Sequence, residues 1–422
     1  MKGSFFLSAS ALWRREMIRF IRQRSRIIGA FASPLIFWLL LGFGVGRSFT
    51  PADQARNMGY QEYFFPGTVL MSEWANFRSS RSTSGWSARG GQCRNPYVLD
   101  RSPLGSSSGS AVAMAANLCA LAVGTETDGS IVSPSSVSGV VGLKPTVGLL
   151  STVGIIPVAH SQDTAGPICR SVQDAAILLT VLAEDQDYTR SLKPDGLKGA
   201  RIGVAFDLAI RDSDIEKLMA MAFDVLKKQG AELIEVRELG TTGPELEVLL
   251  YEFKTDLNAY FVTLDEKFQT LSLKKLIEFN ERSRDRELAI FGQERFLDAE
   301  TRGSLTDQTY LQALDECRRR ARTEGIDAAV SKYRVDAFVA PTCGAAGVIN
   351  PGRGDLFIGR TPALPAVAGY PHITVPAGFS GELPIGLSFF GPARSEATLL
   401  RLAFDFEQAT RLRRRPRLLP SV

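Results

Sequence analysis

Residues 103–134 read PLGSSSGSAVAMAANLCALAVGTETDGSIVSP, and two polar runs lie at the ends of this stretch. Both runs are rich in glycine and serine, and an apolar segment, Ala111 to Ala122, separates them. Its length and composition predict a buried helix of about three turns. A loop that folds back along this helix would bring the two polar runs close together.

Gly129 directly precedes Ser130 in the second polar run. Glycine can adopt backbone conformations that are closed to residues with a Cβ atom, so successive N–H groups in such a turn can point at one spot. Such donors stabilise the oxyanion that forms when a serine attacks a carbonyl group. The alternative is structural, because glycine–serine runs are most often loops, and Ser107 or Ser108 could cap the following helix.

Downstream of Gly196, segments with strand patterns alternate with segments of helical periodicity. Predicted strands cover residues 200–205, 231–236, 335–341 and 385–390. Predicted helices cover residues 213–229, most of 311–333, and 395–410. This alternation is typical of an α/β layered fold.

Composition excludes several classes of protein. The net charge of +4 over 422 residues gives no argument for nucleic acid as a partner. The five cysteines are far apart and form no C-x-x-C pair, which argues against a disulfide scaffold or a zinc knuckle. With only two histidines, a His-rich metal centre is excluded, and a Ser-His-Asp triad would need His160 or His372. The arginines between 411 and 417 predict a solvated, frayed C-terminus.

Residues 27–45, IIGAFASPLIFWLLLGFGV, form an uncharged run of 19 residues. A bilayer needs about 20 apolar residues, so we predict a transmembrane helix here, with a signal peptide or a buried helix as alternatives. Six arginines precede the run, which predicts a cytoplasmic N-terminus. The protein is then membrane-associated if residues 27–45 insert, and cytoplasmic otherwise.

The N-terminal segment resembles the start of an ABC-2-type transporter permease. The matching stretches are ALWRREMIRFIRQRSRIIGAFASPLIFWLLLGFGVG (residues 11–46) and YQEYFFPGTVL (residues 60–70). No second apolar run of membrane length follows, so a working permease channel is not expected. We therefore predict a junction near residue 70, with a permease-like segment at 1–70 and a second domain at 71–422.

From about residue 72 to the C-terminus, the chain resembles the amidase signature family, and its sequence is most similar to the peptide-amidase-like branch. The resemblance includes SEWANFRSS (72–80), the stretch quoted first, Lys144-Pro-Thr, PALPAVAGYPHITVPAG (362–378) and LPIGLSFFGP (383–392). It implies an α/β fold with a mixed central sheet flanked by helices. The family's opening strands and helices have no counterpart here, so the fold is expected to be truncated at its N-terminal side, with poor solubility for residues 71–422.

The resemblance also implies roles for single residues, and it implies no metal and no cofactor. Ser130 matches the nucleophile that forms an acyl-enzyme, and Ser106 matches the bridging serine, which follows a cis Gly105–Ser106 peptide bond. The oxyanion hole matches the backbone amides of Thr127, Asp128, Gly129 and Ser130. The substrate would be a small-molecule or peptide amide, cleaved to a carboxylate and ammonia.

The family's third catalytic group, a lysine upstream of the bridging serine, has no match. No lysine occurs between Lys2 and Lys144, and arginine cannot replace it because a guanidinium does not release its proton. The implied activity is therefore an impaired amidase with an incomplete Ser-Ser-Lys triad. The alternatives are an inert permease fragment or fusion product, and a membrane-tethered binding module without turnover.

Overall fold

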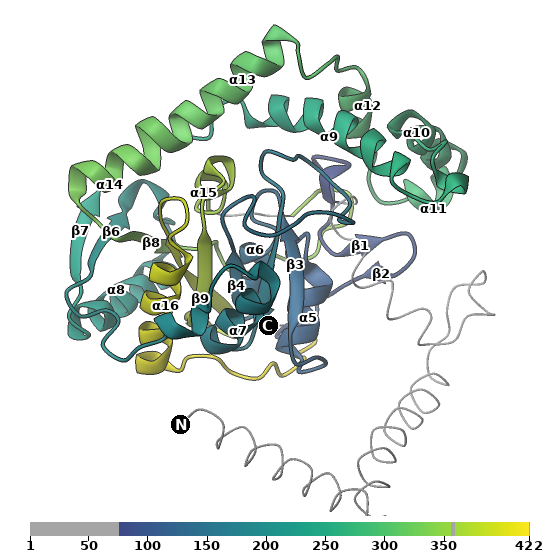
Figure 1. Ribbon diagram of the computed structural model, residues 1–422. Coiled ribbons are helices and arrows are strands. Elements are labelled where there is room, and N and C mark those ends of the chain that lie inside the picture. Colours follow the sequence, from purple (N-terminus) through teal and green to yellow (C-terminus); the bar gives the residue numbers. More distant parts are fainter. Residues whose placement is uncertain (1–75, 356–358, 422) are drawn as a thin grey trace, which may run out of the picture. The chain divides into compact units, whose positions relative to one another are not determined.

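The computed structural model describes residues 76–355 and 359–421, and these form an α/β fold around one mixed sheet (Figure 1). Eight strands make up this sheet in the order β3-β5-β4-β9-β10-β8-β6-β7. In that order the strands are β3 (Ala122–Glu126), β5 (Thr164–Cys169), β4 (Val141–Lys144), β9 (His372–Ser380), β10 (Leu383–Phe390), β8 (Ala337–Pro341), β6 (Arg201–Ala205) and β7 (Glu232–Val236). The predicted mixed sheet flanked by helices is confirmed.

The sheet is antiparallel from β3 to β8 and parallel from β8 to β7. The parallel part consists of strands joined by crossover helices, as parallel pairing requires. A bulge between Ile385 and Gly386 interrupts the β9–β10 ladder. Residues of β10 are all buried, because helices cover both faces of the sheet there.

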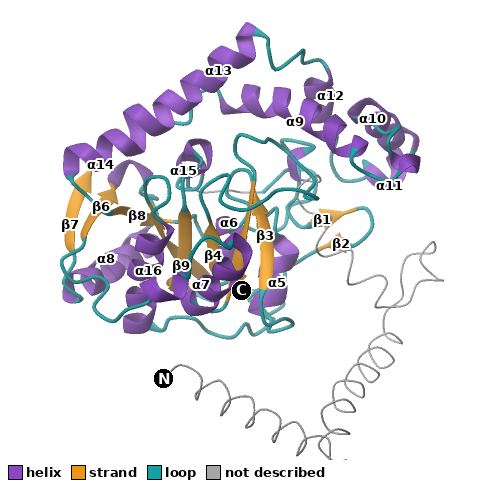
Figure 2. Cartoon of the chain, viewed as in Figure 1, coloured by secondary structure: helices purple, strands orange, loops and turns teal. Residues whose placement is uncertain are grey.

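One face of the sheet packs against α7 (Val172–Ala183), α8 (Ser213–Lys228) and α16 (Glu396–Thr410) (Figure 2). The start of α8 is fixed by Asp212, whose side chain accepts hydrogen bonds from the N–H groups of Asp214 and Ile215. Lys227 and Lys228 in its last turn complement the helix dipole. Buried residues of these helices join the largest apolar core, so this layer supplies much of the burial that holds the sheet.

A second group of helices lies over one end of the strands (Figure 1). It comprises α9 (Glu245–Val262), α10 (Leu273–Arg282), α11 (Arg284–Glu287), α12 (Glu294–Glu300) and α13 (Gln308–Arg318). A separate apolar cluster that includes Phe253, Phe261 and Phe296 joins α9 to α12. A π-helical stretch, Arg319–Ile326, continues α13 into α14 (Asp327–Tyr333).

The remaining elements are short. They are β1 (Trp86–Ser87), β2 (Gly91–Gln92), α5 (Ser108–Ala115), α6 (Val132–Val137), α15 (Ala363–Ala368), and single 3-10 turns at Tyr188–Ser191, Phe206–Leu208 and Glu266–Phe268. The loops before α5 and α6 carry the two polar runs.

The predicted strands and helices downstream of residue 196 are present, as β6, β7, β8 and β10 and as α8, α13–α14 and α16. The predicted helix from Ala111 to Ala122 is wrong in its second half. The helix α5 ends at Ala115, Asn117 adopts a left-handed conformation with φ +60°, and Ala122 begins β3. Continuous apolar runs do not separate a buried helix from a buried strand, which explains the error.

The prediction of a frayed C-terminus is also wrong. The N–H groups of Leu418 and Leu419 donate to the carbonyl oxygens of Pro96 and Tyr97, both at 3.1 Å. The Tyr97 hydroxyl in turn donates to the carbonyl oxygen of Arg414 at 2.5 Å. Backbone pairing therefore holds the arginine-rich end, and the half-buried Arg413 guanidinium adds a hydrogen bond to the Ala115 carbonyl oxygen at 3.2 Å.

The predicted permease-like segment at 1–70, with its transmembrane helix at 27–45, lies outside the described residues. Within the ranges 76–355 and 359–421, no helix is both long enough and apolar enough to cross a membrane.

Candidate active site

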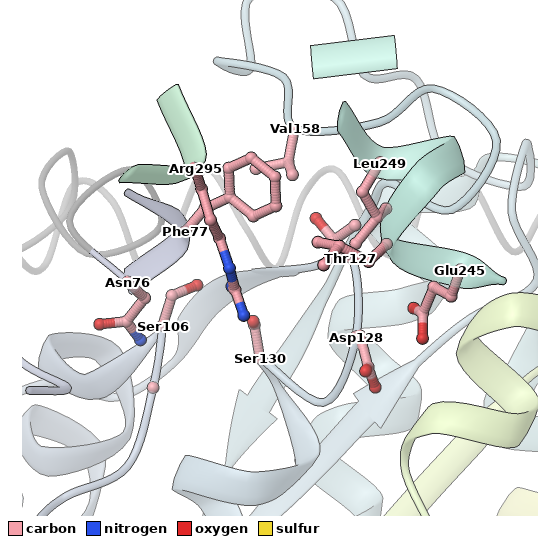
Figure 3. A pocket seen from close by; sticks show the side chains of 12 residues that line it. Asn76, Phe77, Ser106, Thr127, Asp128, Ser130, Val158, Glu245, Leu249 and Arg295 are labelled. Carbon is pink, nitrogen blue, oxygen red and sulfur yellow. The ribbon is translucent and has the colours of Figure 1, made fainter. Parts of the chain in front are cut away.

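Both candidate serines line one cavity of about 310 Å³ (Figure 3). The cavity has walls from the two polar runs, from the loop at Val158, and from α9 and α12. Its lining residues are Asn76, Phe77, Gly105, Ser106, Thr127, Asp128, Ser130, Val158, Glu245, Leu246, Leu249 and Arg295. A volume near 300 Å³ is at the small end of typical ligand pockets.

The two polar runs lie side by side. The Ser107 N–H donates to the Ser130 carbonyl oxygen at 3.1 Å. The Ser107 hydroxyl donates to the Thr125 carbonyl oxygen at 3.0 Å and accepts from the Thr125 N–H at 3.1 Å. The Ser108 hydroxyl donates to the Leu104 carbonyl oxygen. Neither hydroxyl therefore caps α5, and the structural alternative of a capping serine does not account for this run.

The turn before Ser130 requires glycine. Gly129 has φ +78°, and a Cβ atom there would lie 2.9 Å from the Ser133 hydroxyl oxygen and 3.1 Å from Pro362 Cβ. Residues with a side chain rarely adopt this φ, so a substitution would be both strained and crowded.

A buried carboxylate holds the chain that follows Ser130. Glu126 Oε2 accepts hydrogen bonds from the N–H groups of Ile131 at 2.7 Å and Val132 at 3.0 Å. Burial raises the pKa of Glu126, whereas the nearby Lys144 charge and these hydrogen bonds act in the opposite direction. The carboxylate thus fixes the turn from inside the protein without lining the cavity.

Ser106 is buried, and the peptide bond between Gly105 and Ser106 is cis. Its hydroxyl oxygen has no hydrogen-bond partner within the described residues. Asn76 lies against the preceding glycine, since a Cβ atom on Gly105 would come within 2.1 Å of the Asn76 Nδ2 atom. Ser106 therefore presents an unused donor and acceptor next to the cavity that also contains Ser130.

The cavity also carries charged groups. Asp128 lines the cavity, and its side chain is exposed there. Burial raises the pKa of Asp128 well above its usual range, the nearby Glu245 and Glu126 carboxylates raise it further, and Lys144 opposes the shift. The carboxyl group of Asp128 therefore holds its proton to a higher pH than an aspartate in an unfolded chain.

Lys144 is fully buried at the end of β4 and is not among the cavity residues. Its ammonium group donates to the Pro145 carbonyl oxygen at 3.1 Å. Burial lowers the pKa of Lys144 to about 8, against the raising effects of Glu126, Glu396 and Asp128. No lysine lines the cavity within the described ranges.

Neither histidine lines the cavity, so neither can activate Ser130 there. His372 is buried and its Nε2 atom lies 2.5 Å from the Ser388 hydroxyl oxygen. Burial and the Lys144 charge lower the pKa of His372 to about 3. His160 instead contacts Asp256, at 2.8 Å between Nδ1 and Oδ2.

The cysteines also stay outside the cavity, and none is in a disulfide. They are Cys93, Cys119, Cys169, Cys317 and Cys343, of which the last three are buried. The site therefore depends on hydroxyl groups, backbone amides and charged side chains.

An α/β fold with two serines and a glycine turn at one cavity suits an enzyme that attacks a carbonyl group with a serine. The sequence profile of the family described as Amidase matches residues 51–400. A probable amidase of Arabidopsis thaliana is 38% identical over 401 residues, which cover 90% of this chain and 74% of the relative. The chain belongs to the amidase family.

Solved structures agree with this assignment. A peptide amidase in complex with the competitive inhibitor chymostatin superposes with a TM-score of 0.79 at 48% identity, covering 83% of this chain and 75% of that one. The native peptide amidase of Stenotrophomonas maltophilia gives a TM-score of 0.78 at 48% identity, with 83% and 74% covered. The fold is thus the amidase-signature fold. The family match begins at residue 51, within residues 1–70, the segment that we predicted to be permease-like.

Sequence patterns did not identify several cavity residues. Glu245 is the first residue of α9 and Arg295 the second residue of α12, and nothing in their spacing marks them as different from the other charged residues of these helices. Phe77 and Val158 lie in irregular segments far apart in the sequence. Only the packing of α9 and α12 over the strand ends brings these side chains to the serines.

Proposed function

We propose that this protein hydrolyses a linear carboxamide to a carboxylate and ammonia through an acyl-enzyme on Ser130. The single observation that carries the proposal is that Ser130, Ser106 and the Gly129 turn meet at one cavity. Family membership supports the same class of reaction.

The proposed chemistry follows from the positions of these groups. The Ser130 hydroxyl oxygen attacks the amide carbon, and Ser106 relays the proton from Ser130 toward the leaving nitrogen. The negative charge that develops on the substrate oxygen is stabilised by the backbone amides of the turn, those of Thr127, Asp128, Gly129 and Ser130. Ammonia leaves, and water then attacks the ester carbon to release the carboxylate and restore the Ser130 hydroxyl.

The activity is proposed to be strongly reduced. The Ser106 hydroxyl has no hydrogen-bond partner in the described part of the chain, and no lysine occurs between Lys2 and Lys144, so the serine pair lacks the family's base. Removing one member of a nucleophile–base unit usually lowers the rate by several orders of magnitude. The same proposal retains residues 71–422 as the amidase domain, and a permease-like segment at 1–70 that attaches the chain to a membrane if residues 27–45 insert.

We further propose a short peptide with a C-terminal amide as the substrate class. The solved peptide amidase is the relevant neighbour, at 48% identity. The cavity combines apolar walls, such as Phe77 and Leu249, with polar groups that suit an amide. Neither a metal nor an organic cofactor is required by this route.

Ammonia release from a C-terminally amidated dipeptide tests the proposal. The full chain is compared with Ser130→Ala, with Ser106→Ala, and with Ser151→Ala, an exposed serine outside the cavity, as the matched control. We expect slow release by the chain and by the control, and only background with the two cavity variants. Equal release by Ser130→Ala, or none from any protein, would overturn the proposed activity.

A further inference from the structure

Arg295 reaches into the cavity from α12. Figure 3 shows its guanidinium extending toward Ser130, from the wall that also carries Phe77. The guanidinium carbon lies 5.6 Å from the centre of the Phe77 ring, a distance typical of a cation–π contact. The backbone N–H of Arg295 donates to the Arg78 carbonyl oxygen at 3.2 Å, which fixes the start of α12.

The Arg295 side chain has no hydrogen bond or ion pair with another described residue. A guanidinium has five N–H donors, and the usual partners of a buried arginine are carboxylates or carbonyl oxygens. Burial lowers the pKa of Arg295, opposed by Glu294 and Glu245. The Arg295 guanidinium is half-buried, lines the cavity and has N–H donors that no described residue uses, so it is placed to donate to a ligand bound there.

Glu245, the first residue of α9, also lines this cavity. One carboxylate oxygen, Oε1, accepts from the Gln162 amide at 2.9 Å. The same amide nitrogen donates to the Thr127 carbonyl oxygen at 3.2 Å. Gln162 therefore holds Glu245 against the turn that carries Ser130. No described residue donates to the other Glu245 oxygen.

Arg295 and Glu245 are close enough to affect each other electrostatically but do not form an ion pair. Two opposite charges that are both partly buried add little to the stability of the protein unless each has a hydrogen-bonded partner. A ligand group that both accepts and donates would satisfy both. An acylamino group, –C(=O)–NH–, has this combination, and it stands next to the scissile amide of every peptide amide.

We propose that Arg295 and Glu245 together recognise the acylamino group that precedes the scissile amide, with Arg295 donating to its carbonyl oxygen and Glu245 accepting from its N–H. This inference rests on the proposed function only in that the ligand belongs to the same cavity. The side chain on the α-carbon of the bound amino-acid amide lies among Phe77, Val158 and Leu249. The pair selects N-acylated amino-acid amides over simple aliphatic amides.

Binding of three related amides to the full chain, measured by ligand-observed NMR, tests this selection without requiring turnover. The probes are N-acetyl-L-phenylalaninamide, 3-phenylpropionamide, which lacks the acylamino group, and L-phenylalaninamide, which has an ammonium group instead. Ser130→Ala is introduced throughout to prevent hydrolysis. We expect the N-acetyl compound to bind at least about tenfold more tightly than 3-phenylpropionamide.

Arg295→Gln should weaken binding of the N-acetyl compound about tenfold and leave 3-phenylpropionamide within about twofold. Glu245→Leu should have the same selective effect. The matched control, Arg282→Gln on the exposed face of α10, should change neither affinity. Should Arg295→Gln not fold, Arg295→Lys keeps the charge but not the planar fork, and should weaken only the N-acetyl compound.

Equal weakening of both amides by Arg295→Gln would show a structural role and overturn the inference, as would no change in either. Tightest binding of L-phenylalaninamide, lost only in Glu245→Leu, would overturn it in favour of an ammonium site. Selective binding without ammonia release would sink the proposed activity alone. Ammonia release with no selectivity between the amides would sink this inference alone.

Discussion

Two residues, Gly129 and Glu126, set the position of Ser130 in the cavity. Gly129 has a left-handed φ of +78°, and the Glu126 carboxylate accepts hydrogen bonds from the N–H groups of Ile131 and Val132. These residues act by different means, one through backbone freedom and one through buried hydrogen bonds. Their substitutions should therefore have different signatures.

Gly129→Ala should lower amide hydrolysis by about 10²-fold or more with little loss of folded protein. The added Cβ atom would meet Ser133 at 2.9 Å, so the turn must shift and its N–H groups no longer point at one spot. Ammonia release and far-UV circular dichroism measure the two effects. Gly148→Ala, at φ +81° with no atom within 4 Å of the new Cβ, is the control for strain alone. Equal losses in both variants would contradict the argument.

Glu126→Ala should destabilise the protein by about 2–4 kcal/mol, because two buried N–H groups lose their acceptor. Chemical denaturation of the full chain measures this change. The exposed Glu278→Ala on α10 should stay within about 0.5 kcal/mol. A loss for Glu126→Ala as small as that of the control would show that the carboxylate does not hold the turn.

At the scale of elements, α7 and α16 are coupled by one carboxyl group. Glu407 near the end of α16 accepts from the Val172 N–H, in the first turn of α7, at 3.0 Å. Its second oxygen is buried and has no hydrogen-bond partner among the residues that the structure describes. Burial raises the pKa of Glu407 to about 7, the Val172 hydrogen bond lowers it, and the Asp174 charge raises it.

This shift makes stability depend on pH. Because the folded protein holds the Glu407 proton more tightly than the unfolded chain, stability falls as the pH rises from about 4.5 to about 7, and the loss is complete above that. Glu407→Gln keeps an acceptor for Val172 but cannot ionise. We expect it to be more stable than the parent by about 1–3 kcal/mol at pH 8 and nearly equal at pH 4. Urea denaturation of both proteins at pH 4 and pH 8 measures the difference in stability. The same difference at both pH values would refute the prediction.

The elements that sequence patterns predict well are those with a clear period. Helix α8 has an amphipathic spacing that survives in the fold, with Ile215, Met219, Ala222 and Leu226 buried. Strands β6 to β8 are predicted as short segments of strand-forming residues, although their burial does not alternate and β8 is buried throughout. The segment from Ala111 to Ala122 has no clear period, and it is apolar except for Asn117, which adopts a left-handed conformation between the end of α5 and the start of β3. Its apolar residues alone could not place that boundary.

The cavity shows the same limit at the level of the whole molecule. Ser106, Ser130 and their glycines lie in two recognisable runs, so a resemblance could assign them from the sequence. Arg295 and Glu245 come from helices more than a hundred residues downstream, and only the way α9 and α12 cover the strand ends brings them to the serines. Such long-range contacts have no local signal.

The whole described fold also has an open edge. Strand β3 is the last strand of the sheet on its side and pairs only with β5 among the described strands. Leu118, Leu121 and Val123, in and before this strand, are 66%, 42% and 41% exposed. An apolar edge strand is a template for pairing with another chain. We therefore expect a chain of residues 71–422 to elute from a sizing column mainly as aggregates.

Leu121→Lys with Val123→Lys should shift that elution toward the monomer, because lysines on an edge strand oppose edge-to-edge pairing. Met221→Lys with Val262→Lys adds the same charge at helix positions that are 66% and 64% exposed, and should leave the aggregates in place. Equal rescue by both pairs would attribute the effect to net charge rather than to β3. Monomeric elution of the parent chain would show that this edge needs no cover, and that the strands predicted to be missing are dispensable for a soluble fold.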